Sequence, residues 1–144
     1  MARNNFVFVS GNITGDIYFE REYEYRKKVQ PYICMYLMIN GTTFTPAVKG
    51  LRIVAVGPLA ELTYGFVPLG SEIAVFGHIE VRVRKMPGGT TTTIVEVIAE
   101  DIKFLRNVNN DKGMEIWKGL VEEGKMGSSR PKDQNAPAGG SPNE

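Results

Sequence analysis

The sequence predicts an all-β protein built on a five-stranded Greek-key barrel. Five segments are rich in β-branched and aromatic residues and are separated by turn-forming residues. The clearest helical pattern of the first hundred residues falls between the third and fourth of these segments. A chain of 144 residues is long enough to bury one modest core, but too short for two independent ones. One domain with additional terminal segments is therefore expected.

Three strands are expected to form the first half of the barrel. Phe6 to Ile13 form the first strand, and a long polar and aromatic loop is expected over Tyr18 to Gln30. After Pro31, the segment Tyr32 to Asn40 is apolar almost throughout and predicts the second strand. The third strand, residues 51–56, ends at a Gly-Pro pair that marks a turn.

The second half begins with a short helix over residues 58–67, because Leu59, Leu62 and Phe66 recur at helical spacing. Apolar residues then alternate with polar ones from Ile73 to Val83, so the odd-numbered side chains of this fourth strand are expected to face the core. A hairpin loop leads to a fifth strand from Ile94 to Leu105, whose first half is expected to be covered on both sides. This order of elements is that of the oligonucleotide-binding (OB) fold.

Three regions follow from this pattern. Residues 1–106 are expected to form the OB-fold domain. Residues 107–125 are expected to be a linker with an amphipathic helical pattern over Met114 to Lys125. Docking of Trp117 on the barrel is the first interpretation, and docking on a partner is the alternative. Residues 126–144 are dominated by Gly, Ser, Pro, Asn and Asp, which predicts a disordered polar tail.

The composition argues against catalysis. The chain has one histidine, His78, one cysteine, Cys34, and no clustered carboxylates, so it offers neither a set of zinc ligands nor a nucleophile with its base. It also lacks a glycine-rich phosphate loop. We therefore expect no enzyme, no cofactor and no metal.

The expected location is the cytoplasm. Cys34 cannot form an internal disulfide, which favours a reducing compartment. The sequence shows no signal-like or membrane-length apolar segment, so no membrane association is expected. A nucleoid-associated protein fits these features, and an organelle is the alternative.

Three stretches resemble the bacterial-type single-stranded DNA-binding protein family. They are Asn5 to Ile13 with its Gly-Asn-Ile ending, residues 50–85, and residues 93–105. The most specific part reads Gly-x-Leu-Ala-Glu at 57–61, Gly-Ser-x-Ile-x-Val-x-Gly-x-Ile at 70–79, and Arg-x-Arg at 82–84. The resemblance implies the OB barrel, a homotetramer or other homo-oligomer, and sequence-tolerant binding of single strands through base stacking and phosphate contacts.

The chain departs from the family pattern at its aromatic residues and at its end. Gly50 and Val56 stand where the family often has aromatic side chains, and no tryptophan follows Arg84 closely. Phe44 stands where the remaining stacking tryptophan would lie. The end, Gly-Gly-Ser-Pro-Asn-Glu, lacks the acidic run with an apolar pair that recruits repair proteins in the family.

The candidate nucleic-acid-binding residues are aromatic and cationic. The segment from Tyr18 to Lys28 interleaves tyrosines with cations, as a single-strand channel requires, although alternating Glu and Arg could equally form a solvated ribbon whose tyrosines pack on a neighbouring subunit. Tyr32 and Tyr36 are interpreted as core or interface residues, and Phe76 with His78 as a subunit contact. The full set of candidates is Arg21, Tyr23, Tyr25, Arg26, Lys27, Lys28, Phe44, Arg52, Arg82, Arg84 and Lys85.

Two functional hypotheses follow. The first is sequence-tolerant binding and protection of single-stranded DNA in replication, recombination or repair, with replication or repair proteins as further partners. The second is an OB-fold accessory or protein-interaction module of a replication complex with weak affinity for nucleic acid. The first is the leading hypothesis, and the net charge of +1, the missing tryptophans and the unusual tail favour the second.

Overall fold

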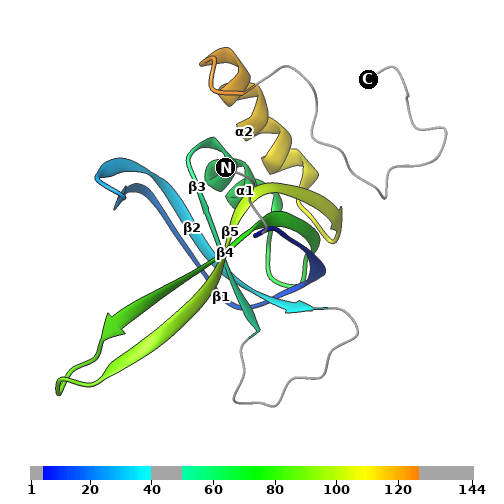
Figure 1. Ribbon diagram of the computed structural model, residues 1–144. Helices are drawn as coiled ribbons and strands as arrows, with labels where there is room; N and C mark the ends of the chain where they lie inside the picture. The colour runs from blue at the N-terminus through cyan, green and yellow to red at the C-terminus, as the bar shows by residue number, and fades with distance from the viewer. Residues whose placement is uncertain (1–4, 40–49, 127–144) are drawn as a thin grey trace.

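The computed structural model describes residues 5–39 and 50–126 as a closed barrel with two helices (Figure 1). The strand order around the barrel is β1-β2-β3-β5-β4, and all neighbours are antiparallel except β3 and β5. The elements are β1 (Val7–Tyr25), β2 (Lys28–Ile39), β3 (Leu51–Val56), α1 (Pro58–Phe66), β4 (Glu72–Lys85), β5 (Thr91–Arg106) and α2 (Asn110–Glu122). This arrangement confirms the predicted OB-like fold class, including the helix between the third and fourth strands.

Alternate residues of the strands fill the barrel. Ile33, Met35 and Leu37 of β2 are fully buried, and they pack with Ile53 and Ala55 of β3. The helix α1 contributes Phe66, whose ring stacks on Phe104 of β5 with a centroid distance of 4.4 Å. Because every second residue of β2 and β3 points into this core, the residues between them lie on the outer surface of the barrel.

The predicted loop over Tyr18 to Gln30 is wrong. β1 continues to Tyr25 and β2 starts at Lys28, so this segment is a long hairpin, called here the β1–β2 hairpin. Only Arg26 and Lys27 form its turn, and both have positive φ angles, of 53° and 66°, as a two-residue hairpin turn requires. The hairpin projects beyond the barrel (Figure 1), and glutamates and cations alternate with its aromatic residues, so it lacks the regular apolar alternation by which a strand is recognised in a sequence.

The predicted core face of β4 is correct only at the start of the strand. Ile73 and Val75 are fully buried, whereas Ile79, Val81 and Val83 are 40%, 62% and 67% exposed. β1 pairs with β4 only from Val7 to Asn12, and beyond this region β4 and β5 continue as a free hairpin that leaves the barrel (Figure 1). We call residues 79–85 and 91–97 the β4–β5 arm. The odd-numbered side chains do share one face, but nothing in the described chain covers it.

The same extension corrects the prediction for β5. Val95 is 48% exposed, so the strand is not covered on both sides at its start, whereas Glu96, Val97, Ile98 and Ala99 are all buried, as expected for a segment covered on both sides. Burial begins at Glu96 and Val97, where β5 enters the barrel beside β3. The boundary between arm and barrel therefore lies near residue 96.

The helix α2 docks on α1 through two glycines. A Cβ atom added to Gly113 would lie only 2.3 Å from the Phe66 ring, and one added to Gly65 would lie 2.6 Å from Cδ1 of Ile116. Trp117 is partly buried against the core cluster, to which α1 and α2 themselves contribute Phe66 and Leu120. The helix starts four residues before the predicted Met114 because the Asn109 side chain accepts a hydrogen bond from the Lys112 amide and caps the helix there.

None of the helices in the described ranges is long and apolar enough to span a membrane.

Candidate nucleic-acid interface

A group of tyrosines covers the outer surface of the barrel at β2. Tyr32 and Tyr36 alternate with the core residues of this strand and therefore point outwards. Tyr23 of β1 stacks on Tyr32, with ring centroids 4.1 Å apart and an angle of 22° between the ring planes. Tyr18 and Tyr25 also contact Tyr32, at centroid distances of 6.1 Å and 5.8 Å. We call Tyr18, Tyr23, Tyr25, Tyr32 and Tyr36 the tyrosine face.

An irregularity in β1 brings the tyrosines of this strand to the same face. Tyr18 lies opposite Cys34 and Tyr23 lies opposite Gln30, with a shift of register between Glu20 and Tyr23. In a regular strand, residues five positions apart point to opposite faces. A bulge adds a residue to one strand and reverses the alternation, so Tyr18 and Tyr23 meet on one side of the hairpin.

The tyrosine face encloses an open pocket with a mixed polar and aromatic lining. Its volume, about 260 Å³, is below the usual range of sites for drug-sized ligands and cofactors, which suits a flat ring better than a large molecule. The lining residues are Asp16, Tyr18, Tyr23, Tyr32, Cys34, Tyr36 and Arg52. Tyr18 is 47% exposed, so one ring at the rim is accessible from solvent.

Arg52 of β3 is held beside the tyrosine rings by three hydrogen bonds. Its Nε donates to Oε1 of Glu96 at 2.9 Å, and its Nη atoms donate to the hydroxyls of Tyr36 and Tyr32 at 3.1 Å and 3.5 Å. Burial is the largest single influence on the pKa of Arg52 and would lower it, but the hydrogen bonds to Glu96 and Tyr36 and the neighbouring Cys34 and Tyr32 together raise this pKa. Burial raises the pKa of Tyr32 to about 12, so its hydroxyl stays protonated at neutral pH. The pocket therefore contains a fixed cation next to neutral aromatic rings.

Glu96 connects the tyrosine face with the β4–β5 arm. Its side chain is only 4% exposed, and its second oxygen lies 3.4 Å from Nε of Arg82. Arg82 and Arg84 are on the same face of the arm, opposite Ile94 and Thr92 of β5. Arginines thus continue from the pocket along one face of the arm.

The tip of the β1–β2 hairpin is tied to β4. Arg26 forms an ion pair with Glu80, and its guanidinium lies over the Tyr25 ring, 5.1 Å from the centroid. Glu80 also contacts Nε2 of His78 at 2.8 Å, and Nδ1 of His78 contacts Glu100 at 2.6 Å. These hydrogen bonds raise the pKa of His78. Partial burial would raise the pKa of Glu80, but the hydrogen bond with His78 and the charge of Arg26 lower it.

Five of the predicted site residues converge on this surface. Tyr23, Tyr25 and Arg26 from the hairpin meet Arg52 and Arg82 around the pocket. The remaining cations of this set are exposed at the two hairpin ends: Lys27, Lys28, Arg84 and Lys85. Lys85 follows Arg84 directly in the strand and therefore points to the opposite, apolar face of the arm.

Of the predicted residues that the structure describes, Arg21 and Lys85 are not brought to this surface. Arg21 lies on the other side of the hairpin, where its Nε is 3.8 Å from Glu61 of α1. Phe44 lies outside the described residues. Conversely, Tyr32, Tyr36 and Glu96 belong to the site but were not among the candidates. The alternation of Tyr32, Cys34 and Tyr36 with core residues was the available sequence signal, whereas no local signal marks Glu96.

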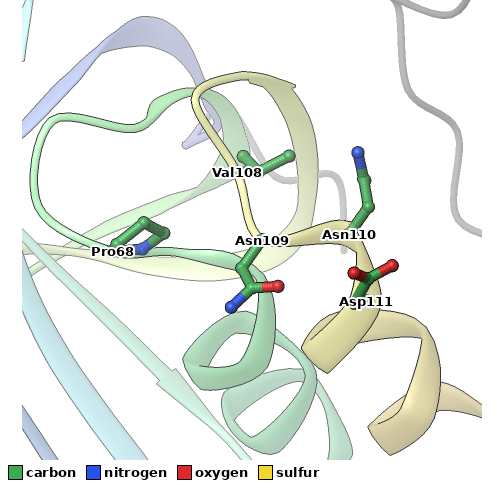
Figure 2. Close-up of a pocket in the computed structure, with 5 residues that line it drawn as sticks. All are labelled: Pro68, Val108, Asn109, Asn110 and Asp111. Carbon is green, nitrogen blue, oxygen red and sulfur yellow. The ribbon is translucent and has the colours of Figure 1, made fainter.

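A second hollow, at the start of α2, offers no comparable chemistry. Figure 2 shows its lining: Pro68, Val108, Asn109, Asn110 and Asp111. Asn109 already serves as the helix cap, and the one carboxylate here has no nucleophile or base beside it. In residues 5–39 and 50–126, no three His, Cys, Asp or Glu side chains are grouped so as to hold a metal ion.

Comparisons with known proteins support the fold. No protein-family model matches the sequence, and no curated protein shows significant sequence similarity. Among solved structures, the chain is similar to a small single-stranded DNA-binding protein from Streptomyces coelicolor, with a TM-score of 0.52 and 18% sequence identity. The alignment covers 71% of this chain and 95% of that protein. At this identity, the likeness establishes a shared barrel architecture.

Proposed function

We propose that the chain binds single-stranded DNA without sequence preference and protects exposed strands in replication, recombination or repair. The observation that carries this proposal is the tyrosine face with Arg52, on the outer surface of β2 and β3. OB folds bind oligonucleotides on this surface and on the two hairpin loops beside it. The likeness to a single-stranded DNA-binding protein supports the same function.

The proposed mechanism combines stacking with charge. Bases stack on the accessible tyrosine rings, and the arginines of the arm bind phosphates. Every base has a flat π-face and every nucleotide has a phosphate, so contacts of these two kinds do not depend on sequence. Binding at exposed strands would place the protein at the nucleoid and near replication or repair proteins.

The alternative is an accessory or protein-interaction module with weak affinity for nucleic acid. Carboxylates on the same surface favour this alternative: Glu80 pairs with Arg26, and Glu96 pairs with both Arg52 and Arg82. A phosphate would have to compete with these carboxylates. Tight, salt-sensitive binding of fluorescent oligo-dT would support the first function, and binding only at very low salt would support the alternative.

We also propose that the protein is a homo-oligomer. Phe8 and Phe76 stack on the outside of β1 and β4, with centroids 4.4 Å apart, and both remain exposed. Exposed apolar patches of this kind often mark protein contacts. Light scattering at micromolar concentration should give a multiple of the chain mass, and Phe8→Lys should reduce it. A wild-type protein with the mass of one chain would overturn this proposal.

Changing Arg82 and Arg84 together to alanine should weaken binding to all single-stranded sequences alike. Each phosphate contact on a single strand contributes about 0.7 to the slope of log K against log salt. The slope should therefore decrease by roughly 0.7 to 1.4, with the lower value if Glu96 keeps Arg82 neutralised. Titrations of oligo-dT and a mixed sequence at several salt concentrations measure the slope. An unchanged slope would show that phosphates do not contact the arm.

A further inference from the structure

A second group of aromatic and cationic side chains lies on the other side of the β1–β2 hairpin. The rings of Phe19 and Tyr64 are parallel, with a centroid distance of 4.1 Å and an interplanar angle of 7°. The Arg21 guanidinium lies 5.8 Å from the centroid of the Phe19 ring, and Nζ of Lys112 lies 4.3 Å from that of Tyr64. These four residues, from β1, α1 and α2, form a cation–aromatic stack with a cation at each end.

The cation–aromatic stack is not required to hold α2 in place. The contact of Gly113 with Phe66, the contact of Gly65 with Ile116 and the buried Leu120 already attach α2 to α1 and the core. Tyr64 is 38% exposed, and the Arg21 side chain is 64% exposed. A stack whose aromatic and cationic groups are this accessible is available to a ligand.

A hollow beside Tyr64 gives the stack a binding surface. Ile17, Val67 and Pro68 supply apolar walls, and Asn109 and Lys112 supply polar groups at the edge. Both faces of Phe19 are covered, one by Tyr64 and the other by Arg21. On Tyr64, one face is covered by Phe19 and the other only by the flexible Lys112 side chain. A flat ring could therefore reach the stack by replacing Lys112 above Tyr64.

We propose that the cation–aromatic stack is a second contact site for single-stranded nucleic acid. This inference rests on the proposed function and extends it. A base takes the face of Tyr64 that Lys112 now covers, and the two cations bind the flanking phosphates. Aromatic platforms between cations are the combination that single-strand channels use. An apolar wall with a cation at its edge also fits a nucleotide better than it fits a free anion.

The position of the stack makes it reachable from the tyrosine face. Tyr18 and Phe19 are consecutive in β1 and point to opposite sides of the hairpin. Beyond Asn12, β1 pairs only with β2 among the described strands, so no further described strand pairs with the other edge of β1. A nucleic-acid strand that crosses this edge would contact first one site and then the other.

The test compares short and long oligo-dT, because only a long strand can occupy both sites. Site sizes of OB folds range from about 4 to about 16 nucleotides, so fluorescent oligomers of these two lengths are suitable. Lys112→Ala and Tyr64→Leu should each weaken binding of the long oligomer at least about fivefold and leave the short one unchanged. Lys118→Ala, on the same helix, is the control and should affect neither. Thermal melting checks that Tyr64→Leu still folds, and Lys112→Ala changes an exposed side chain only.

Two results would overturn the second site. If both variants bind both lengths like the wild type, the stack is only structural. If both lengths are weakened equally, the stack is not a separate site. A wild-type protein that binds neither length would instead refute the proposed function itself, and the second site with it.

Discussion

Replacing Tyr18 and Tyr23 together by alanine should weaken oligo-dT binding by roughly 2 to 6 kcal/mol, because each stacked base contributes about 1–3 kcal/mol. Both rings line the pocket, and Tyr23 also stacks on Tyr32. The double change removes no lysine or arginine, so the salt dependence of the remaining binding should stay unchanged. Fluorescence titrations at several salt concentrations measure both quantities.

The matched control for this pair is the double change to phenylalanine. Tyr18→Phe and Tyr23→Phe keep the rings and remove only the hydroxyls, one of which donates to Glu20. Affinity close to that of the wild type is expected. If the phenylalanine variant loses as much affinity as the alanine variant, the hydroxyls rather than the rings bind the ligand. If the alanine variant binds normally, the tyrosine face is not the interface.

Glu96→Gln should destabilise the fold and strengthen nucleic-acid binding of the folded protein. Removing one partner of a buried ion pair costs about 3–5 kcal/mol, and the lower end is expected here because Arg52 retains some contact with solvent. Arg52 and Arg82 then lose the carboxylate that neutralises them. The salt slope should increase by about 0.7 for each arginine that gains a phosphate.

Urea unfolding and oligo-dT titration measure the two effects separately. Glu100→Gln is the control, because its carboxylate is largely exposed and its ion-pair partner among the described residues is His78. That change should alter the free energy of unfolding by about 1 kcal/mol or less. Weaker binding by the folded Glu96→Gln protein would contradict a competing role for Glu96. It would indicate that Glu96 is needed to position Arg52.

The fold was predictable where its core side chains repeat along the chain. The second and third strands, the helix before the fourth strand and the buried start of β4 all followed from apolar residues at strand or helix spacing. The β1–β2 hairpin was not predictable, because its many charged residues and its Arg-Lys turn are also typical of a loop. Alternation also could not show that Val81 and Val83 are uncovered. It reveals which side chains share a face, but not where the barrel ends.

The site was predictable only in part, because it depends on contacts between distant strands. Tyr23, Arg52 and Arg82 were expected from residue type. Tyr32 was assigned to the core or an interface, since its strand is apolar on both sides. Glu96 reaches Arg52 only because β5 lies beside β3 in the sheet, which no local pattern reveals. The position of Arg21 on the other side of the hairpin was not predictable, because the bulge that follows Glu20 changes which residues of β1 share a face.

A nuclear magnetic resonance titration with a short oligo-dT tests the location of the interface most directly. Amide signals of Tyr32 to Tyr36 and Arg52, together with those of the β1–β2 hairpin, should shift as the oligomer is added, and the shifts should saturate. Signals around Phe8 and Phe76, on the outside of β1 and β4, should remain in place. Shifts concentrated around Phe8 and Phe76, with the tyrosine face unaffected, would contradict binding at the outer surface of β2 and β3.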